Sequence, residues 1–335
     1  MGVSGLSGKF LLEYFPQLPS AKLTSFTLNY NKGNLFVKVL FRLPRFFICM
    51  IKEHLVLANL IKERQIDCVI SDNRYGLWNK KIYSVLITHQ PYIKLPSGIK
   101  FLQPFTWAIT GLMIQKFNKC WIPDIKNISN SISGELSHRK NMPKRYRYIG
   151  LLSRFNRSES FNAKNSKKYK LLIILSGPEP QRTIFENIIV NQIRSLKVTA
   201  IIFRGLPDNN SELEPVNRVK ILNNATDDDF ITFISQAEHI ICRSGYSTLM
   251  DLISLQKTAL LVPTPGQTEQ EYLADYLVSK GMFLARSQKE FNLSLALEDL
   301  EDFKNRNSFH PASTKNLFED VINELRNTLS KLKRL

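Results

Sequence analysis

The second half of the chain alternates short aliphatic runs with longer helical patterns. The aliphatic runs occupy residues 169–176, 198–203, 219–222, 239–242 and 258–262. Apolar runs of this length, without polar alternation, are typical of parallel strands that are covered on both faces. The helical patterns occupy residues 183–196, 228–236, 247–255 and 269–280. This order predicts βαβ units in an α/β fold, and an α+β domain with an antiparallel sheet fits it less well.

The first half carries a weaker form of the same pattern. Short apolar runs at residues 67–72, 84–89 and 120–123 indicate buried strands. Residues 154–168 are polar, rich in Ser and Asn and without periodicity, which is typical of a linker. A length of 335 residues also favours two domains. We therefore expect a first domain over residues 1–153 and a second over residues 169–335.

The chain is strongly basic, with a net charge of +17. Such a surplus favours an anionic partner, which can be nucleic acid, phospholipid or a phosphorylated substrate, unless it is only a Lys-rich composition. The basic residues are scattered and no nucleic-acid-binding motif is present, so we expect no nucleic acid partner. The four cysteines form no C-x-x-C pair, which fits a reducing cytoplasm and neither a disulfide framework nor a metal site.

Two segments of the first half combine large apolar side chains with basic ones. Residues 34–51 include Lys38, Arg42, Arg45 and two adjacent phenylalanines, and residues 99–119 are similar. A basic, aromatic amphipathic surface is what contact with an anionic membrane surface requires. An ordinary helix with its lysines in water explains each segment about equally well. No signal peptide and no apolar run of membrane-spanning length is visible, so we expect a cytoplasmic protein that can be peripheral to the inner face of the plasma membrane.

The most specific local pattern covers residues 242–251 (CRSGYSTLMD). It predicts a strand, a turn at Ser244 and Gly245, and a helix that Ser247 or Thr248 can cap. Free N–H groups at such a helix start can bind a pyrophosphate, although a plain capped helix gives the same pattern. Asp251 lies about one turn into the helix, where its carboxylate can accept from two ribose hydroxyls.

Two further turns follow strands in the same domain. Ser176 and Gly177 would expose amides between a strand and a helix, as a simple Gly-Pro turn would also do. Gln270 and Glu271 would lie in a first helical turn, where they can hold sugar hydroxyls or simply favour the helix dipole. Ligands of open α/β sheets bind at the carboxyl ends of strands, so we assign these residues, Ser247, and Arg204, which follows another strand, to one donor site.

Two other groups are candidates for chemistry. Residues 227–229 (DDD) suggest a metal site, but clustered acids at a helix start favour the dipole and no further ligand stands at a suitable spacing, so we expect no metal. His89 ends a predicted strand and can be a general base, although such a histidine more often only packs. Asp72 ends the preceding strand and is a second catalytic candidate.

The pattern at residues 242–251, with residues 263–272 after it, resembles the C-terminal donor domain of the family 28 glycosyltransferases, which include the bacterial enzyme that transfers N-acetylglucosamine to lipid I. The resemblance implies that Arg243, Ser244, Gly245, Thr248 and Asp251 hold a nucleotide. Asp251 replaces the Glu of the best-known members. Glu271 stands where the family has the second Gln of a pair, which leaves the donor sugar open.

Residues 71–77, 87–90, 134–138 and 148–155 resemble a narrower, uncharacterised bacterial group of the same kind. Together the resemblance implies a GT-B fold of two Rossmann-like domains. It also implies inverting, metal- and cofactor-independent transfer from a UDP-sugar to a lipid-linked or cell-envelope acceptor. A sugar-nucleotide 2-epimerase and a non-catalytic sugar-nucleotide-binding protein remain alternatives. Family members open with a strand, a Gly-rich loop and a helix, and we expect this first unit to be missing here.

Overall fold

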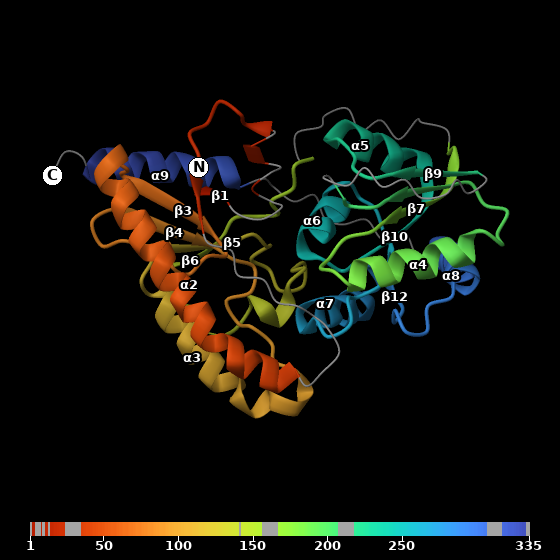
Figure 1. The fold of residues 1–335 in the computed structure, drawn as a ribbon, viewed down its shortest axis with the longest axis horizontal. Helices are drawn as coiled ribbons and strands as arrows, with labels where there is room; N and C mark the ends of the chain where they lie inside the picture. The colour runs from red at the N-terminus through yellow and green to blue at the C-terminus, as the bar shows by residue number, and fades with distance from the viewer. Residues whose placement is uncertain are drawn as a thin grey trace.

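Two lobes lie next to each other in the computed structural model, and each contains a parallel sheet with helices packed on it (Figure 1). The structure describes residues 2–3, 8, 11–12, 14–23, 35–140, 142–155, 167–206, 218–306 and 317–332. Because every described strand pair is parallel, the predicted α/β class with two Rossmann-like sheets is confirmed.

The main sheet of the first lobe has four parallel strands in the order β3-β4-β5-β6. They are β3 (Cys68–Asp72), β4 (Tyr83–Ile87), β5 (Lys119–Ile122) and β6 (Tyr146–Tyr148). The first three agree with the apolar runs of the sequence. The sequence did not indicate β6, because Tyr-Arg-Tyr is not an aliphatic run. Val85, Leu86 and Cys120 are fully buried and form the centre of this sheet.

A separate parallel pair near the N-terminus consists of β1 (Gly2–Val3) and β2 (Ala21–Lys22). Among the described residues, β3 pairs with β4 and with no strand on its other edge. Ile70 on β3 is 44% exposed, which is unusual for a large apolar side chain in a parallel strand. The missing first strand and loop stay a prediction.

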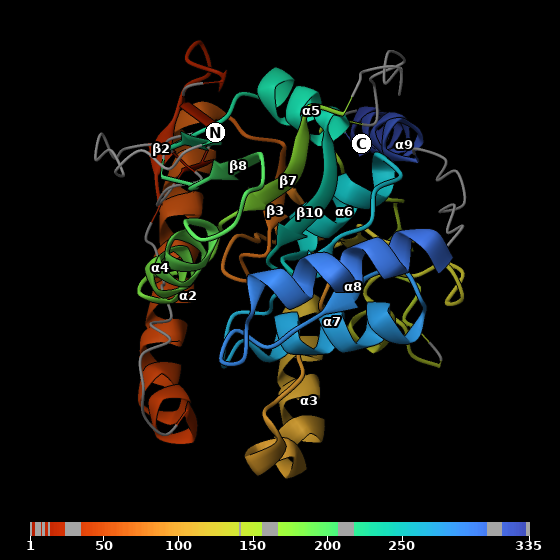
Figure 2. The same ribbon diagram turned by 90° about the vertical axis from the view of Figure 1, so that its right-hand side faces the viewer.

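Two helices of the first lobe extend below the rest of the molecule in both ribbon views (Figure 1, Figure 2). They are α2 (Leu35–Arg64), which contains Pro44, and α3 (Gln103–Ile114), which follows the 3-10 helix η1 (Ser97–Leu102). The two basic, aromatic segments of the sequence lie largely on these helices, although the side chains of Lys38 and Arg42 lie outside the described residues. Among the described residues, no helix has the length and apolar character needed to cross a membrane.

The second lobe has six parallel strands in the order β12-β11-β10-β7-β8-β9. They are β7 (Tyr169–Ile174), β8 (Ala200–Phe203), β9 (Val219–Leu222), β10 (Ala237–Cys242), β11 (Leu260–Leu261) and β12 (Leu284–Ala285). All but β12 were expected from the sequence. The order reverses between β7 and β10, which makes this pair the topological switch point, where open α/β sheets bind their ligands.

Helices cover both faces of the second sheet. They are α4 (Gln181–Ile193), α5 (Asp227–Gln236), α6 (Tyr246–Ser254), α7 (Thr268–Ser279) and α8 (Leu293–Arg306). Side chains of α5, α6 and α7 pack in one buried cluster, and those of α4 and α8 pack in another. The doubly wound arrangement therefore has a core on each side of the sheet.

The last helix, α9 (Phe318–Leu332), lies on the first lobe (Figure 1). Val321 and Leu325 pack with Val85 and Trp121 of the first sheet. The chain after α8 therefore returns to the first lobe, although the sequence assigned residues 169–335 to the second domain. The two lobes are joined by the segment after β6 and by this returning segment.

Candidate functional site

The loops that follow β7, β10, β11 and β12 meet at the carboxyl edge of the second sheet, and Arg243 joins them. Its guanidinium donates to Gln181 O at 2.9 Å and to Val262 O at 3.0 Å. It also donates to the side-chain oxygen of Gln288 at 2.6 Å. The side chain thus connects the start of α4 with the segments after β11 and β12.

Arg243 is 1% exposed and stacks over the ring of Phe185, with 4.4 Å from Cζ to the ring centroid. Among the described residues, its guanidinium contacts only neutral oxygens and this ring, and burial lowers the pKa of Arg243 to about 10. The sequence assigned Arg243 to the donor site, and the structure places its side chain beneath the loops that form that edge. It therefore positions the loops and adds a buried positive charge under them.

The turn after β10 leads directly into α6. Gly245 is the N-cap residue, and no side chain bonds to the first N–H groups of the helix. The expectation that Ser247 or Thr248 caps α6 is therefore wrong, because the helix already begins at Tyr246 and both hydroxyls lie inside it. A Cβ at Gly245 would meet nothing within 4 Å, so the turn is open on that side of Gly245. An uncapped helix start of this kind is a ready site for an anion.

The turn after β7 is the second part of this edge. Gly177 has φ +103°, a conformation that side chains other than glycine rarely adopt. A Cβ at Gly177 would lie 3.3 Å from the Thr264 hydroxyl oxygen, so the turns after β7 and β11 approach each other closely here. Ser176 is half-buried and Gly177 is exposed. The sequence prediction that these turns come together agrees with this arrangement.

Asp251 lies one turn into α6 and is almost buried. Ser153 donates its hydroxyl to Asp251 Oδ1 at 2.7 Å, and Arg154 Nε lies 3.4 Å from Oδ2. Arg154 also pairs with Asp227 at 2.5 Å and lies over the ring of Phe230. Burial raises the pKa of the Asp251 carboxyl, and the contacts from Ser153 and Arg154 oppose this shift. The segment after β6 therefore covers the predicted ribose-binding carboxylate.

Sequence reasoning did not assign Ser153 and Arg154 to the site. Both belong to the stretch 148–155, which carried part of the family resemblance, and Arg154 was placed at the start of the linker. Their place in that motif was the only signal in the sequence. Ser153 and Asp251 are 98 positions apart, so local pattern could not indicate their contact.

The other predicted donor residues serve mainly to hold loops. Gln270 accepts a hydrogen bond from Thr264 N at 2.9 Å, and its backbone oxygen accepts from the Ser244 hydroxyl at 2.8 Å. Glu271 Oε1 accepts a hydrogen bond from Gly266 N at 2.9 Å. Arg204 is buried and pairs with Glu186 at 2.6 Å, so its charge is compensated inside the lobe. A direct contact of Arg204 with a ligand does not agree with this burial.

The first lobe contributes His89, which follows β4. Its Nε2 lies 2.7 Å from Glu269 Oε1, and its ring stacks on Tyr246 with 4.0 Å between centroids. Asp72 ends the neighbouring strand β3, and desolvation raises the pKa of its carboxyl while His89 and Arg74 oppose the shift. The two catalytic candidates therefore lie on adjacent strand ends, and His89 contacts the second lobe.

A loop of the first lobe, residues 124–138, docks against α7. Buried Asp124 organises this loop by accepting hydrogen bonds from Ser131 Oγ at 2.6 Å and from Ser133 N at 3.0 Å. Glu135 N in turn donates to Tyr272 OH of α7 at 2.7 Å. The contact between the lobes is thus built from ordered backbone and does not depend on a single pair.

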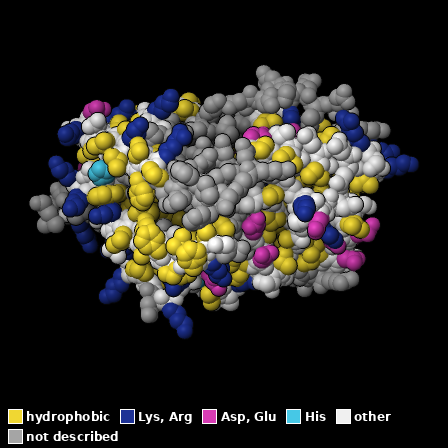
Figure 3. Space-filling view, turned by 60° about the horizontal axis from the view of Figure 1, so that its bottom comes forward, with side chains coloured by type: hydrophobic (Ala, Val, Ile, Leu, Met, Phe, Trp, Pro, Cys, Tyr) yellow, Lys and Arg dark blue, Asp and Glu magenta, His cyan; other side chains and the backbone are white. Residues whose placement is uncertain are grey.

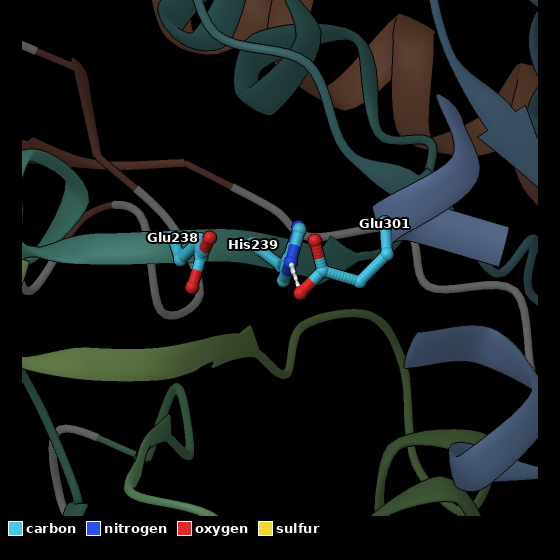
Figure 4. A group of neighbouring side chains, drawn as sticks. All are labelled: Glu238, His239 and Glu301. Atoms are coloured by element: carbon cyan, nitrogen blue, oxygen red, sulfur yellow. Dashed lines mark ion pairs between the residues drawn. The ribbon is translucent and has the colours of Figure 1, made fainter. Parts of the chain in front are cut away.

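Two of the three acidic side chains at residues 227–229 have other partners. Asp227 pairs with Arg154, and Asp229 forms a capping box with Thr226 at the start of α5. The one described group of suitable ligands is Glu238, His239 and Glu301 (Figure 4). It lies at the start of β10, at the opposite end of the strand from the turn. Lys170 contacts both of its carboxylates, and Lys304 pairs with Glu238 at 2.6 Å.

Comparison with known proteins finds similarity to one family model and to several solved structures. Residues 204–325 match the family model of the glycosyltransferase family 28 C-terminal domain. The match contains the turn after β10, Asp251 and the loop after β11. No curated protein sequence matches the chain.

Solved structures of GT-B proteins share the fold of nearly the whole chain. A kitacinnamycin glycosyltransferase has a TM-score of 0.59 at 12% identity, over 91% of this chain and 86% of that one. Acinetobacter baumannii MurG has a TM-score of 0.51 at 12% identity, over 90% and 81%. Methanocaldococcus jannaschii UDP-GlcNAc 2-epimerase, solved with UDP-GlcNAc and UDP, has a TM-score of 0.53 at 14% identity, over 95% and 88%. The chain thus has the GT-B fold, and its residues 204–325 match the family 28 C-terminal domain.

Proposed function

We propose that the chain is an inverting, metal-independent glycosyltransferase that uses a UDP-sugar, with N-acetylglucosamine or a similar sugar as the group transferred. The observation that carries the proposal is the uncapped start of α6 at the switch point, with Asp251 one turn further on. Helix N–H groups and the nearby Arg243 charge would stabilise the departing diphosphate in the role that a cation has elsewhere.

The donor would lie along the edge formed by the turns at Gly177 and Gly245. Its ribose hydroxyls would donate to Asp251 and displace the Ser153 hydroxyl, which now occupies Oδ1. Arg154 would stay close to the ligand, because it is held over the rings of Phe155 and Phe230. The uridine nucleotide is supported by the family 28 match and by the UDP-GlcNAc-binding epimerase of the same fold.

The acceptor would be lipid-linked or part of the cell envelope. An apolar surface on α2, η1 and α3 supports this, and we define it by its exposed residues Phe47, Ile48, Ile51, Leu55, Phe101, Phe105 and Leu112. Figure 3 shows hydrophobic side chains gathered on this side of the first lobe, with Lys and Arg around them. An apolar surface with a basic edge suits the inner face of a membrane with anionic lipids.

The experiment that tests the function is UDP release from UDP-GlcNAc, with and without an envelope lipid extract as acceptor. Release should continue in EDTA, because backbone N–H groups and not a metal would stabilise the diphosphate. Asp251→Asn should reduce release about tenfold or more, whereas Asp228→Ala, a change at an exposed carboxylate of α5, should leave it unchanged. Release that requires a divalent metal and stops in Asp228→Ala would contradict the proposal.

A 2-epimerase is the second candidate, favoured by the fold shared with the Methanocaldococcus jannaschii enzyme over 95% of this chain. It would bind the same donor without an acceptor. The sugar product separates the two functions, because an epimerase inverts the configuration at C2 of UDP-GlcNAc and a transferase leaves that carbon unchanged.

A further inference from the structure

One contact joins a histidine of the first lobe to a carboxylate of the second, next to the proposed diphosphate site. His89 follows β4, and Glu269 is the second residue of α7. His89 Nε2 and Glu269 Oε1 are 2.7 Å apart. Their side chains keep exposed fractions of 18% and 29%, so the pair is accessible from outside.

Tyr246 fixes the plane of the imidazole. The two rings are nearly parallel, with an interplanar angle of 7°. Tyr246 is itself buried, and its hydroxyl donates to Pro123 O of the first lobe at 2.8 Å. Because Tyr246 is the first residue of α6, the imidazole stacks on a side chain that belongs to the helix start at which we propose the diphosphate binds.

Other titratable groups near the pair do not replace Glu269. Asp72 on β3 is close enough to influence His89 electrostatically, but the carboxylate in hydrogen-bond contact is that of Glu269. Arg74 pairs with Glu53 of α2, and the Tyr246 hydroxyl is directed to Pro123. Glu269 is therefore the group that can set which nitrogen of His89 carries the proton.

We propose that Glu269 is a positioning residue that makes His89 the general base of the transfer. The Glu269 carboxylate accepts the Nε2–H of His89, which leaves Nδ1 unprotonated. Nδ1 then takes the proton of the acceptor hydroxyl as its oxygen bonds to the anomeric carbon of the sugar. The bond from that carbon to the diphosphate oxygen breaks, and its electron pair leaves with UDP. This inference rests on the proposed function.

Because the two groups come from different lobes, the base is complete only when the lobes are in contact as seen here. Other contacts hold the lobes together independently of the pair. Thr268 donates its hydroxyl to Lys94 O at 3.0 Å, and Tyr272 accepts from Glu135 N. Removal of the Glu269 charge should therefore leave the fold and the lobe contact in place.

The test compares Glu269→Gln and Glu269→Asp with the unchanged chain. In UDP release from UDP-GlcNAc, Glu269→Gln should lower kcat about 10- to 100-fold while KM and the Kd for UDP stay within about twofold, since general-base catalysis contributes roughly 10²–10⁴-fold. Glu269→Asp should recover part of the loss. Asp275→Asn, a change at an exposed carboxylate of the same helix, is the matched control and should leave kcat unchanged.

An NMR measurement of the imidazole nitrogens tests the pairing without turnover. In the unchanged chain His89, assigned with His89→Gln, should carry its proton on Nε2, and this preference should be lost in Glu269→Gln. The inference is overturned if His89 has no such preference, if Glu269→Gln keeps kcat, or if it loses UDP binding instead. An unchanged chain that neither binds UDP nor releases it would contradict the proposed function, and the NMR result would still decide the pairing.

Discussion

Arg243 is a fully buried cation whose partners are four neutral oxygens from three segments of the second lobe. Burial of an ion costs several kcal/mol, and hydrogen bonds to carbonyl oxygens offset only part of it. A diphosphate bound at the overlying turns would supply the missing negative charge. Arg243 should therefore act in donor binding through the loops it holds and through its charge.

Replacement of Arg243 by Met should weaken binding of the diphosphate group but not binding of the nucleoside. UDP affinity should fall about tenfold or more, which is about 1.4 kcal/mol, and uridine affinity should change little. Arg243→Lys should retain part of the UDP affinity, because the charge remains and the fork of donors is lost. Calorimetric titration measures each of these affinities.

The matched control is Arg286→Met, because Arg286 follows β12 of the same sheet and its charge is paired by Asp299 at 2.5 Å. Circular dichroism checks that the variants are folded. If folded Arg243→Met binds UDP as tightly as the unchanged chain, the Arg243 charge has no part in donor binding.

The sequence located the turns of this site but not the partners of their side chains. Ser176, Gly177, Ser244 and Gly245 follow apolar strands, so their place at one sheet edge was predictable from strand order. The buried roles of Arg243 and Arg204 were not, because local pattern carries no information on which distant oxygens or carboxylates a side chain meets. The contact between His89 and Glu269 was not predictable either, because the two residues are 180 positions apart in the sequence.

At the scale of elements, α2 and α3 carry the feature with the clearest consequence. The sequence indicated a basic, aromatic segment over 34–51, but α2 continues to Arg64 because residues 52–64 also favour a helix. Phe101 and Phe105 are 76% and 65% exposed, and the ribbon views show α2 and α3 projecting from the first lobe. A monomeric protein rarely leaves such side chains grouped in water without a function.

Vesicles that contain anionic phospholipid should therefore retain the protein at low salt. The double change Phe101→Ser and Phe105→Ser should weaken retention about tenfold or more, since each buried Phe contributes roughly 1.5–3 kcal/mol. Sedimentation with anionic and with neutral vesicles measures the effect. Ile184→Ser, at an exposed position of α4 in the second lobe, is the control and should leave retention unchanged. If the unchanged chain stays in the supernatant, the apolar surface is not a membrane contact.

The strands and helices of the second lobe were the most predictable elements. Aliphatic runs marked β7–β11, and helical periodicity marked α4–α7 to within about three residues at each end. The sequence missed β12 and β6, which are short edge strands of the sheets. Such strands bury few side chains, so their composition does not separate them from loops.

The whole molecule is held together by more than its linker. Tyr246, Glu269 and Tyr272 of the second lobe contact strand ends and loops of the first, and α9 returns to pack beside β4 and β5. These contacts place the turn after β10 next to His89. The sequence predicted two lobes, but their contact depends on pairs far apart in the chain and was outside the reach of local patterns.

The central claim is that the second lobe binds a UDP-sugar donor along α6, and calorimetric titration of UDP into the full chain without added metal tests it most directly. We predict binding to the unchanged chain that weakens about tenfold or more in Asp251→Ala and in the isosteric Asp251→Asn, because Ala removes both acceptor oxygens and Asn replaces one of them with a donor and removes the charge. A folded chain that takes up no UDP, or Asp251 variants that bind it as tightly as the unchanged chain, would contradict this account.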